Sequence, residues 1–326
     1  MTPFNPLFRN PHLATIAGNF WKRPETHRWP VEAVIYQTEP EVRVLVHTQR
    51  PAGEPRGELV LVHGLEGSSD AGYAKSMAYA ALSAGYVTHR VNLRSCGGTE
   101  ELALTNYHSG QTSDVLHVLR ERKRSSGLPI YLTGFSLGGN ISLKLAGELG
   151  ESGPELLAGV CAVSTPIDLA SCADALGKRE NFIYRDRFLS RLKQRIRVRH
   201  GQAPEIYTLE HLPKIRTIYD FDDYYTARFF GFGTAAEYYR TQSSNQFLEK
   251  IRVPAMLVTA KDDPLVPFEV YNHAAFASNR HLRLVAVDHG GHIGFISRTR
   301  PRFWLDGLVI DWLLEISHKK PATFVS

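Results

Sequence analysis

Short apolar runs rich in β-branched residues alternate with helical stretches along most of this 326-residue chain, and this alternation constrains the fold more than any other feature. Strands are predicted at residues 31–37, 42–49, 58–64, 86–93, 129–135, 157–164, 253–260 and 281–287. Helices are predicted between them at 70–84, 112–123 and 137–149. Such alternation is typical of a mostly parallel sheet flanked by helices. We therefore expect an α/β protein with eight strands.

A further helix is expected near the C-terminus, where Phe303, Leu308, Trp312 and Leu313 follow helical spacing. Pro301 precedes them, and proline is favoured at the first position of a helix. This helix should pack on the sheet.

The regular alternation of strands and helices is interrupted between the sixth and seventh predicted strands. Residues 171–249 contain no strong strand signal and are rich in Arg, Tyr and Phe. Because 326 residues exceed the usual size of a single core, we expect a core domain formed by 1–170 and 250–326. Residues 171–249 are then a helical lid inserted between strands 6 and 7.

The composition excludes several classes of protein. A net charge of +5 is mild for this length and does not imply nucleic acid. Cys96, Cys161 and Cys172 have neither C-x-x-C spacing nor an even number, so neither a disulfide framework nor a zinc site is expected. The sequence also lacks the H-E-x-x-H, P-loop and G-x-G-x-x-G motifs, so we expect no metal or nucleotide cofactor.

The start of the chain lacks the pattern of a secretory signal peptide, and no window of 18 apolar residues occurs. Together with the odd set of cysteines, this predicts a soluble protein of a reducing compartment, the cytoplasm.

Ser136 lies in the segment GFSLG (134–138), between a predicted strand and a predicted helix. A serine on a sharp turn of this kind needs neighbours without side chains, and Gly134 and Gly138 provide the space. The turn would raise the hydroxyl above the carboxyl ends of the strands, where such sheets place ligands. Ser136 is therefore the candidate nucleophile, and the alternative is a simple helix N-cap.

A serine nucleophile needs a base and an orienting carboxylate, which follow it in the order acid, then histidine, in sheets of this class. AKDDPLVP follows the seventh strand and offers Asp262 and Asp263. VDHGGHIGF follows the eighth and offers His289 and His292. Asp263 is preferred because the residues after it can anchor it in apolar surroundings, and His292 because glycines flank it. Asp262 and His289 stay open as alternatives.

An oxyanion would be stabilised by backbone N–H groups. The amide of Leu137 follows the candidate nucleophile, and the amide of Leu65 lies in the loop after the third strand. His63 in the same loop is expected to be a structural turn residue, with a direct role as the alternative.

Several segments together resemble the α/β-hydrolase superfamily, specifically its AB hydrolase 4 (YheT-like) family. They are NPHLATI, VHGLEGSS, NLRSCGG, YHSGQTSD, GFSLGG, VSTPIDL, TIYDFDDYYTARFFGF, AEYYRTQSS, AKDDPLVP and HGGHIGF, and they span nearly the whole chain. The resemblance implies Ser136 as nucleophile, Asp263 as acid and His292 as base. Members with assigned activities resemble esterases and lipases. Two positions depart from the family pattern: Ser95 stands where glycine is usual, and Ala14 where glutamine is usual.

The predicted lid contains a helix with two stripes. Phe188, Leu192 and Ile196 form an apolar stripe, and a basic stripe beside it consists of Arg187, Arg191 and Arg195. A basic amphipathic helix can contact anionic lipid, although an apolar underside with a solvated charged face is the simpler interpretation. The aromatic segment FDDYYTARFFGFGTAAEYY lines an acyl pocket or, alternatively, packs in a core.

The residues thus predict a serine hydrolase that cleaves carboxylic esters of small-molecule substrates through an acyl-enzyme. A thioesterase, amidase or lactonase could use the same three residues. A scaffold that has lost catalysis on the same fold is the alternative from another class.

Overall fold

The computed structural model describes residues 3–318, which are built around one sheet with the strand order β1-β2-β4-β3-β5-β6-β7-β8. The strands are β1 (Glu32–Glu39), β2 (Val42–Gln49), β3 (Gly57–Val62), β4 (Tyr86–Val91), β5 (Ile130–Phe135), β6 (Gly159–Val163), β7 (Ala255–Ala260) and β8 (Leu282–Val287). β2 is antiparallel to β1 and to β4, and every neighbouring pair from β4 to β8 is parallel. The prediction of an eight-stranded, mostly parallel sheet is confirmed.

The helices alternate with the strands in the core and cluster between β6 and β7. They are α1 (Pro11–Phe20), α2 (Gly72–Ser83), α3 (Ser113–Ser126), α4 (Leu137–Leu149), α5 (Gly153–Leu156), α6 (Leu169–Gly177), α7 (Phe182–Gln202), α8 (Ile218–Phe221), α9 (Ala227–Phe229), α10 (Ala235–Gln242), α11 (Ala275–Ser278) and α12 (Trp304–His318). The predicted helix at 137–149 has the bounds of α4.

Two apolar cores lie on opposite faces of the sheet, because successive side chains of a strand point to opposite sides. In β3, Leu59 and Leu61 pack with residues of α2 and α12, whereas Val60 and Val62 pack with residues of α3 and α4. All six residues of β3 are buried, as expected for a strand covered on both faces. β3 is therefore mostly apolar, with Glu58 as its one charged residue.

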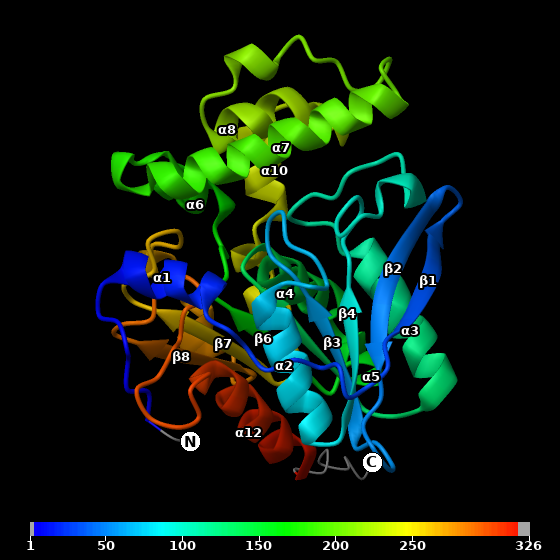
Figure 1. Ribbon diagram of the computed structural model, residues 1–326, viewed down its shortest axis with the longest axis vertical. Coiled ribbons are helices and arrows are strands. Elements are labelled where there is room, and N and C mark those ends of the chain that lie inside the picture. The colour runs from blue at the N-terminus through cyan, green and yellow to red at the C-terminus, as the bar shows by residue number, and fades with distance from the viewer. Residues whose placement is uncertain (1–2, 319–326) are drawn as a thin grey trace.

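The segment from α6 to the 3₁₀ turn after α10, residues 169–250, is called the insert here. Figure 1 shows its helices α6, α7, α8 and α10 gathered in a layer at one end of the sheet. The insert has an apolar cluster of its own, in which Leu192, Ile196 and Phe221 are buried. A break in the strand rhythm thus marked a helical segment, and its division from the core as a separate lid domain stays a prediction.

The C-terminal helix was predicted correctly, but its start was not. α12 begins at Trp304, so Pro301 precedes the helix and does not open it. The backbone N–H of Ser297 donates to the carbonyl of Arg302 at 2.8 Å, which holds residues 297–302 in a turn. Pro301 therefore belongs to this turn, and α12 begins three residues later.

Within residues 3–318, no helix is both long and apolar enough to cross a membrane. Over the same range, no group of His, Cys, Asp and Glu side chains is arranged to hold a metal ion. Cys96, Cys161 and Cys172 are free and buried.

Candidate active site

Ser136 occupies the sharp turn between β5 and α4, with φ 51° and ψ −122°. Its N–H donates to the carbonyl of Val163 at 2.8 Å, which ties the turn to β6. A Cβ on Gly134 would lie 2.1 Å from the carbonyl oxygen of Gly138, and a Cβ on Gly138 would lie 2.3 Å from that of Val62. Both glycines are therefore required by close backbone approach, as the sequence predicted. A non-glycine residue at this φ is strained, which is common where a site fixes a side chain.

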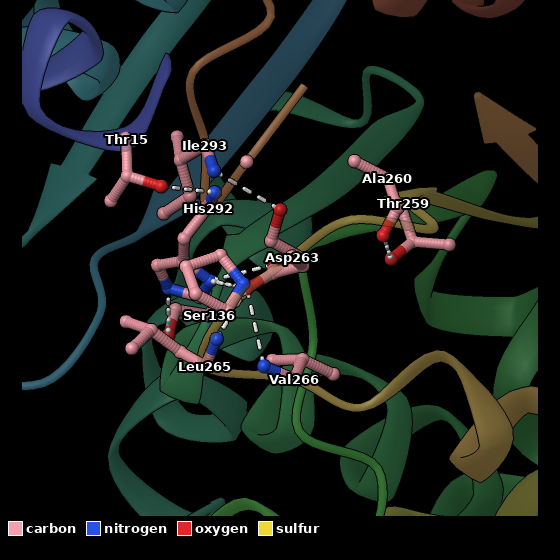
Figure 2. A network of polar contacts seen from close by, with 12 residues as sticks. Thr15, Ser136, Thr259, Ala260, Asp263, Leu265, Val266, His292 and Ile293 are labelled. Carbon is pink, nitrogen blue, oxygen red and sulfur yellow. Dashed lines mark hydrogen bonds and ion pairs between the residues drawn. The ribbon is translucent and has the colours of Figure 1, made fainter. Parts of the chain in front are cut away.

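The side chain of Ser136 makes no N-cap hydrogen bond to α4. It faces His292 instead, whose Nε2 lies 2.9 Å from Oγ of Ser136. Nδ1 of His292 lies 2.9 Å from Oδ2 and 3.2 Å from Oδ1 of Asp263. Figure 2 shows the imidazole between the hydroxyl and the carboxylate. Three side chains from distant parts of the chain thus form one hydrogen-bonded series. Ser136 stands at the N-cap position of α4, but its side chain does not cap the helix.

The carboxylate of Asp263 is fully buried and fixed from its other side. Oδ1 accepts hydrogen bonds from the N–H groups of Leu265 at 2.9 Å and Val266 at 3.1 Å. These bonds satisfy the buried oxygens and orient the carboxylate toward His292. The segment DPLV thus anchors the carboxylate through two backbone amides, and the side chains of Leu265 and Val266 are buried beside it.

Asp262 and His289, the alternatives left open by the sequence, pair with each other at 3.1 Å. Oδ1 of Asp262 also accepts the N–H groups of Gly290 and Gly291, each at 2.9 Å. The two neighbouring aspartates therefore have different partners: Asp263 contacts the imidazole of His292, and Asp262 holds the loop that carries it.

The loop of His292 is fixed from two further elements. The backbone N–H of His292 donates to Oγ1 of Thr15 on α1 at 2.8 Å. The backbone N–H of Ile293 donates to Oγ of Ser164 at 3.2 Å. Ile293 and Phe295 have φ of 57° and 37°, so the loop is strained and needs these anchors. No local sequence pattern indicates this role of Thr15, although it lies in the segment NPHLATI.

His63 lies in the loop after β3, and its side chain is buried. Its Nδ1 lies 2.8 Å from the carbonyl of Gly64, and the N–H of Leu93 donates to its Nε2 at 3.1 Å. Burial lowers the pKa of His63 to about 4, so the ring is neutral at pH 7. The expectation of a structural turn residue agrees with these contacts.

The loop that contains Leu65 lies directly against the nucleophile. A Cβ on Gly64 would lie 3.0 Å from Cβ of Ser136 and 3.6 Å from its Oγ. Among the residues that the structure describes, the amides of Leu65 and Leu137 donate no hydrogen bond to another residue. Both N–H groups are therefore free to bind an oxygen atom.

A cavity of about 380 Å³ opens at Ser136 and His292, between the sheet and the insert. Its wall includes many aromatic residues of the insert: Tyr207, Phe221, Tyr224, Tyr225, Phe229, Phe230, Tyr238 and Tyr239. The apolar stripe of α7, residues Phe188, Leu192 and Ile196, also faces it. The aromatic segment thus contributes to a pocket as well as to packing.

A few polar groups interrupt the apolar wall. The carboxyl of Asp222 accepts hydrogen bonds from Thr226 at 2.6 Å and from Tyr239 at 2.7 Å, and burial raises its pKa to about 6. Burial lowers the pKa of His108 to about 3, so this ring is neutral. The cavity therefore provides a few hydrogen-bonding groups in a largely aromatic space.

The basic stripe of α7 is not a uniform charged surface. Arg187 and Arg191 are exposed, but Arg195 points inward and forms an ion pair with Glu66 at 2.9 Å. The expectation that all three guanidinium groups form one solvated stripe is wrong. A helical repeat places them on one side of α7, but it does not show which of them meets a carboxylate.

Comparisons with known proteins agree with this architecture. A family model described as the alpha/beta hydrolase fold (Abhydrolase_1) matches residues 58–299. The chain is 31% identical over 314 residues to Putative esterase YheT of Escherichia coli (strain K12), an alignment that covers 94% of this chain and 91% of that protein. It is 29% identical over 261 residues to Monoacylglycerol lipase of Saccharomyces cerevisiae (strain ATCC 204508 / S288c), with coverage of 76% of this chain and 56% of the yeast protein.

Among solved structures, the Pyrococcus furiosus esterase Pf2001 matches with a TM-score of 0.58 at 16% identity, over 90% of this chain and 99% of that one. This likeness concerns the fold. The family match over most of the chain and the near-complete alignment with YheT carry the assignment: the chain belongs to the α/β-hydrolase family, as a relative of YheT.

Proposed function

We propose that this α/β hydrolase is a serine esterase that cleaves carboxylic esters through an acyl-enzyme. One observation carries the proposal: contacts of 2.9 Å join Oγ of Ser136 to His292 and His292 to the carboxylate of Asp263, and Ser136 and His292 line the cavity. The names of the esterase and lipase relatives support an ester as the substrate.

In the first step, Nε2 of His292 takes the proton of Ser136 while Oγ attacks the carbonyl carbon of the ester. Asp263 accepts the Nδ1–H hydrogen bond, which fixes the tautomer and stabilises the imidazolium that forms. Because Asp263 is fully buried and already bonded to two backbone amides, its carboxylate needs no reorganisation during the reaction.

The carbonyl oxygen becomes an oxyanion as the tetrahedral intermediate forms. The N–H groups of Leu65 and Leu137 are the donors that we assign to it. The intermediate collapses when the C–O bond to the alcohol breaks and His292 returns the proton to that oxygen. Water then attacks the acyl-enzyme by the same route, which releases the carboxylic acid and restores Ser136.

The largely aromatic cavity favours an apolar acyl or alcohol group as the part of the substrate that binds there. Thioesters, amides and lactones can react at the same three side chains. A comparison of p-nitrophenyl esters with matched thioester and amide substrates separates these reaction types by their relative kcat/KM.

We also propose that the insert acts as a lid and that the protein works in a reducing compartment, the cytoplasm, where its free, buried thiols would persist.

Contact of the insert with anionic lipid through Arg187 and Arg191 is a further part of this proposal, because both side chains are exposed on α7. Co-sedimentation with vesicles of phosphatidylglycerol tests the contact. An Arg187→Glu/Arg191→Glu variant that sediments like the wild type would exclude it.

The function itself is tested by steady-state kinetics on p-nitrophenyl esters from acetate to palmitate. Ser136→Ala is expected to lower kcat by about 10⁴-fold or more, with the melting temperature close to that of the wild type. A non-catalytic scaffold would give no enzymatic turnover in the wild-type protein, and the proposal fails if Ser136→Ala keeps most of the activity.

A further inference from the structure

A buried ion pair connects the insert to the loop that contains Leu65. Nε of Arg195, on α7, donates to Oε1 of Glu66 at 3.0 Å, and Nη2 donates to Oε2 at 2.9 Å. The two side chains are only 11% and 5% exposed. Such a two-point contact between guanidinium and carboxylate fixes direction as well as distance.

Glu66 follows Leu65 directly, and its own backbone is in the left-handed region with φ 53°. This conformation costs a non-glycine residue roughly 1 kcal/mol or more, so it persists only where neighbours hold it. The N–H of Glu66 donates to Oη of Tyr107 at 2.9 Å, and its carbonyl accepts from Arg191 at 3.1 Å. The side chain is held by Arg195 and by the hydroxyl of Tyr107 at 3.1 Å.

Gly64, on the other side of Leu65, packs against Ser136. Leu65, whose N–H lies in the peptide that joins it to Gly64, therefore stands between a residue in contact with the nucleophile and a residue held by α7. A shift of Glu66 would move Leu65 and turn its N–H away from the carbonyl oxygen of a substrate, because hydrogen bonds weaken steeply with angle.

We propose that Arg195 is a positioning residue for oxyanion stabilisation, which it exerts by holding Glu66 and thereby the amide of Leu65. The proposal rests on the proposed function. It makes helix α7 part of the machinery that stabilises the transition state, in addition to its place in the wall of the cavity.

Two other roles would give different results. Arg195 and Glu66 both line the cavity, so Arg195 could contact the substrate directly, which would change KM. Arg195 could also only attach α7 to the core, as Arg199 does one turn later on the same helix. Arg199 is fully buried and bonds to the carbonyls of Glu100 at 2.7 Å and Thr105 at 3.3 Å, without contacting Glu66.

The test compares Arg195→Met, Arg195→Lys and Glu66→Gln with the matched control Arg199→Met, on p-nitrophenyl butyrate. Arg195→Met is expected to lower kcat at least about tenfold with KM within about twofold, because a donor is displaced and not removed. Arg195→Lys should recover part of the loss. Arg199→Met should lower the melting temperature but keep kcat within about twofold of the wild type.

The second readout is inhibition by a trifluoromethyl ketone, which forms a tetrahedral oxyanion adduct with the serine. Its Ki should rise in Arg195→Met by about the same factor as kcat/KM falls. Glu66→Gln keeps the shape of the side chain and should show the same changes in kcat and Ki. It replaces Arg195→Met in the test if that variant does not fold. In the double variant Arg195→Met/Glu66→Gln, the loss of kcat should be smaller than the product of the two single losses.

The proposal is overturned if Arg195→Met changes KM alone, if its kcat stays within twofold of the wild type, or if Arg199→Met loses kcat equally. Failure of the proposed function is a different result: the wild type would then show no serine-dependent turnover, and Ser136→Ala would match it. If turnover of the wild type depends on Ser136 but Arg195→Met has the kcat of the wild type, only the positioning role of Arg195 is excluded.

Discussion

Oγ1 of Thr15 accepts the backbone N–H of His292 at 2.8 Å, across 277 residues of sequence. The same hydroxyl donates to the carbonyl of Pro11 at 2.7 Å, so it is fixed within α1. Helix α1 is therefore a support of the loop that carries the imidazole, although it lies outside the core of alternating strands and helices.

Thr15→Val keeps the shape of the side chain and removes the acceptor. The backbone N–H of His292 then loses its partner. We expect the free energy of unfolding to fall by about 1 kcal/mol and kcat to fall several-fold, because the loop is held less firmly. Thr133→Val is the control, because the Thr133 hydroxyl is buried without a partner among the described residues. Chemical denaturation and ester kinetics measure both variants. Equal effects of the two would contradict the supporting role of Thr15.

The adjacent aspartates Asp262 and Asp263 form a natural pair for comparison. Asp263→Asn should lower kcat by about 10⁴-fold with little loss of stability, because an amide cannot hold the imidazole in the required tautomer. Asp262→Asn should lower the melting temperature and leave kcat within about tenfold, because Asp262 contacts the loop and not the imidazole of His292. Reversed effects in the two variants would assign the acid to Asp262.

Ser95, one of the two departures from the family pattern, has φ 64°. Glycine is usual at this position because it adopts positive φ without strain. The hydroxyl of Ser95 accepts a hydrogen bond from Nη2 of Arg199, a contact that glycine lacks. Ser95→Gly should relieve strain and lose the contact, and so change the free energy of unfolding by less than about 1 kcal/mol. Ser95→Ala, which loses the contact and keeps the strain, should be the less stable variant in urea denaturation.

Asp222 makes stability depend on pH. Its carboxyl has a pKa of about 6 when folded against an ordinary value of 3.8, because burial disfavours the charged form. Its folded pKa is raised, so the unfolded state ionises first and stability is lost as pH rises from about 4 to about 6. The loss is up to about 3 kcal/mol. Asp222→Asn should weaken the pH dependence of the melting temperature over this range and be more stable than the wild type at pH 7.5. A wild-type profile that is flat between pH 4 and pH 6 would contradict this account.

The sequence predicts the sheet well because its central strands are buried on both faces and read as apolar runs bounded by turns. Ser136 is also visible in the sequence, since its flanking glycines are required locally. The character of the flanking residues favours Asp263 over Asp262 and His292 over His289. In the structure Asp263 lies 2.9 Å from His292, and Asp262 lies 3.1 Å from His289.

The contacts that could not be predicted join residues far apart in the chain. Nothing near Thr15 or Ser164 shows that each accepts an amide of the loop at 292–293. Arg195 was interpreted as a surface cation because its helical position is all that a sequence pattern gives. Its partner Glu66 lies 129 residues away, and only the fold brings the two together.

The most direct test of the central claim is reaction with a fluorophosphonate probe, followed by peptide mass spectrometry. The account predicts one labelled residue, Ser136, and labelling that becomes at least about a hundredfold slower in His292→Ala, since the hydroxyl then lacks its base. Labelling at another residue, or a rate that His292→Ala leaves unchanged, would contradict it.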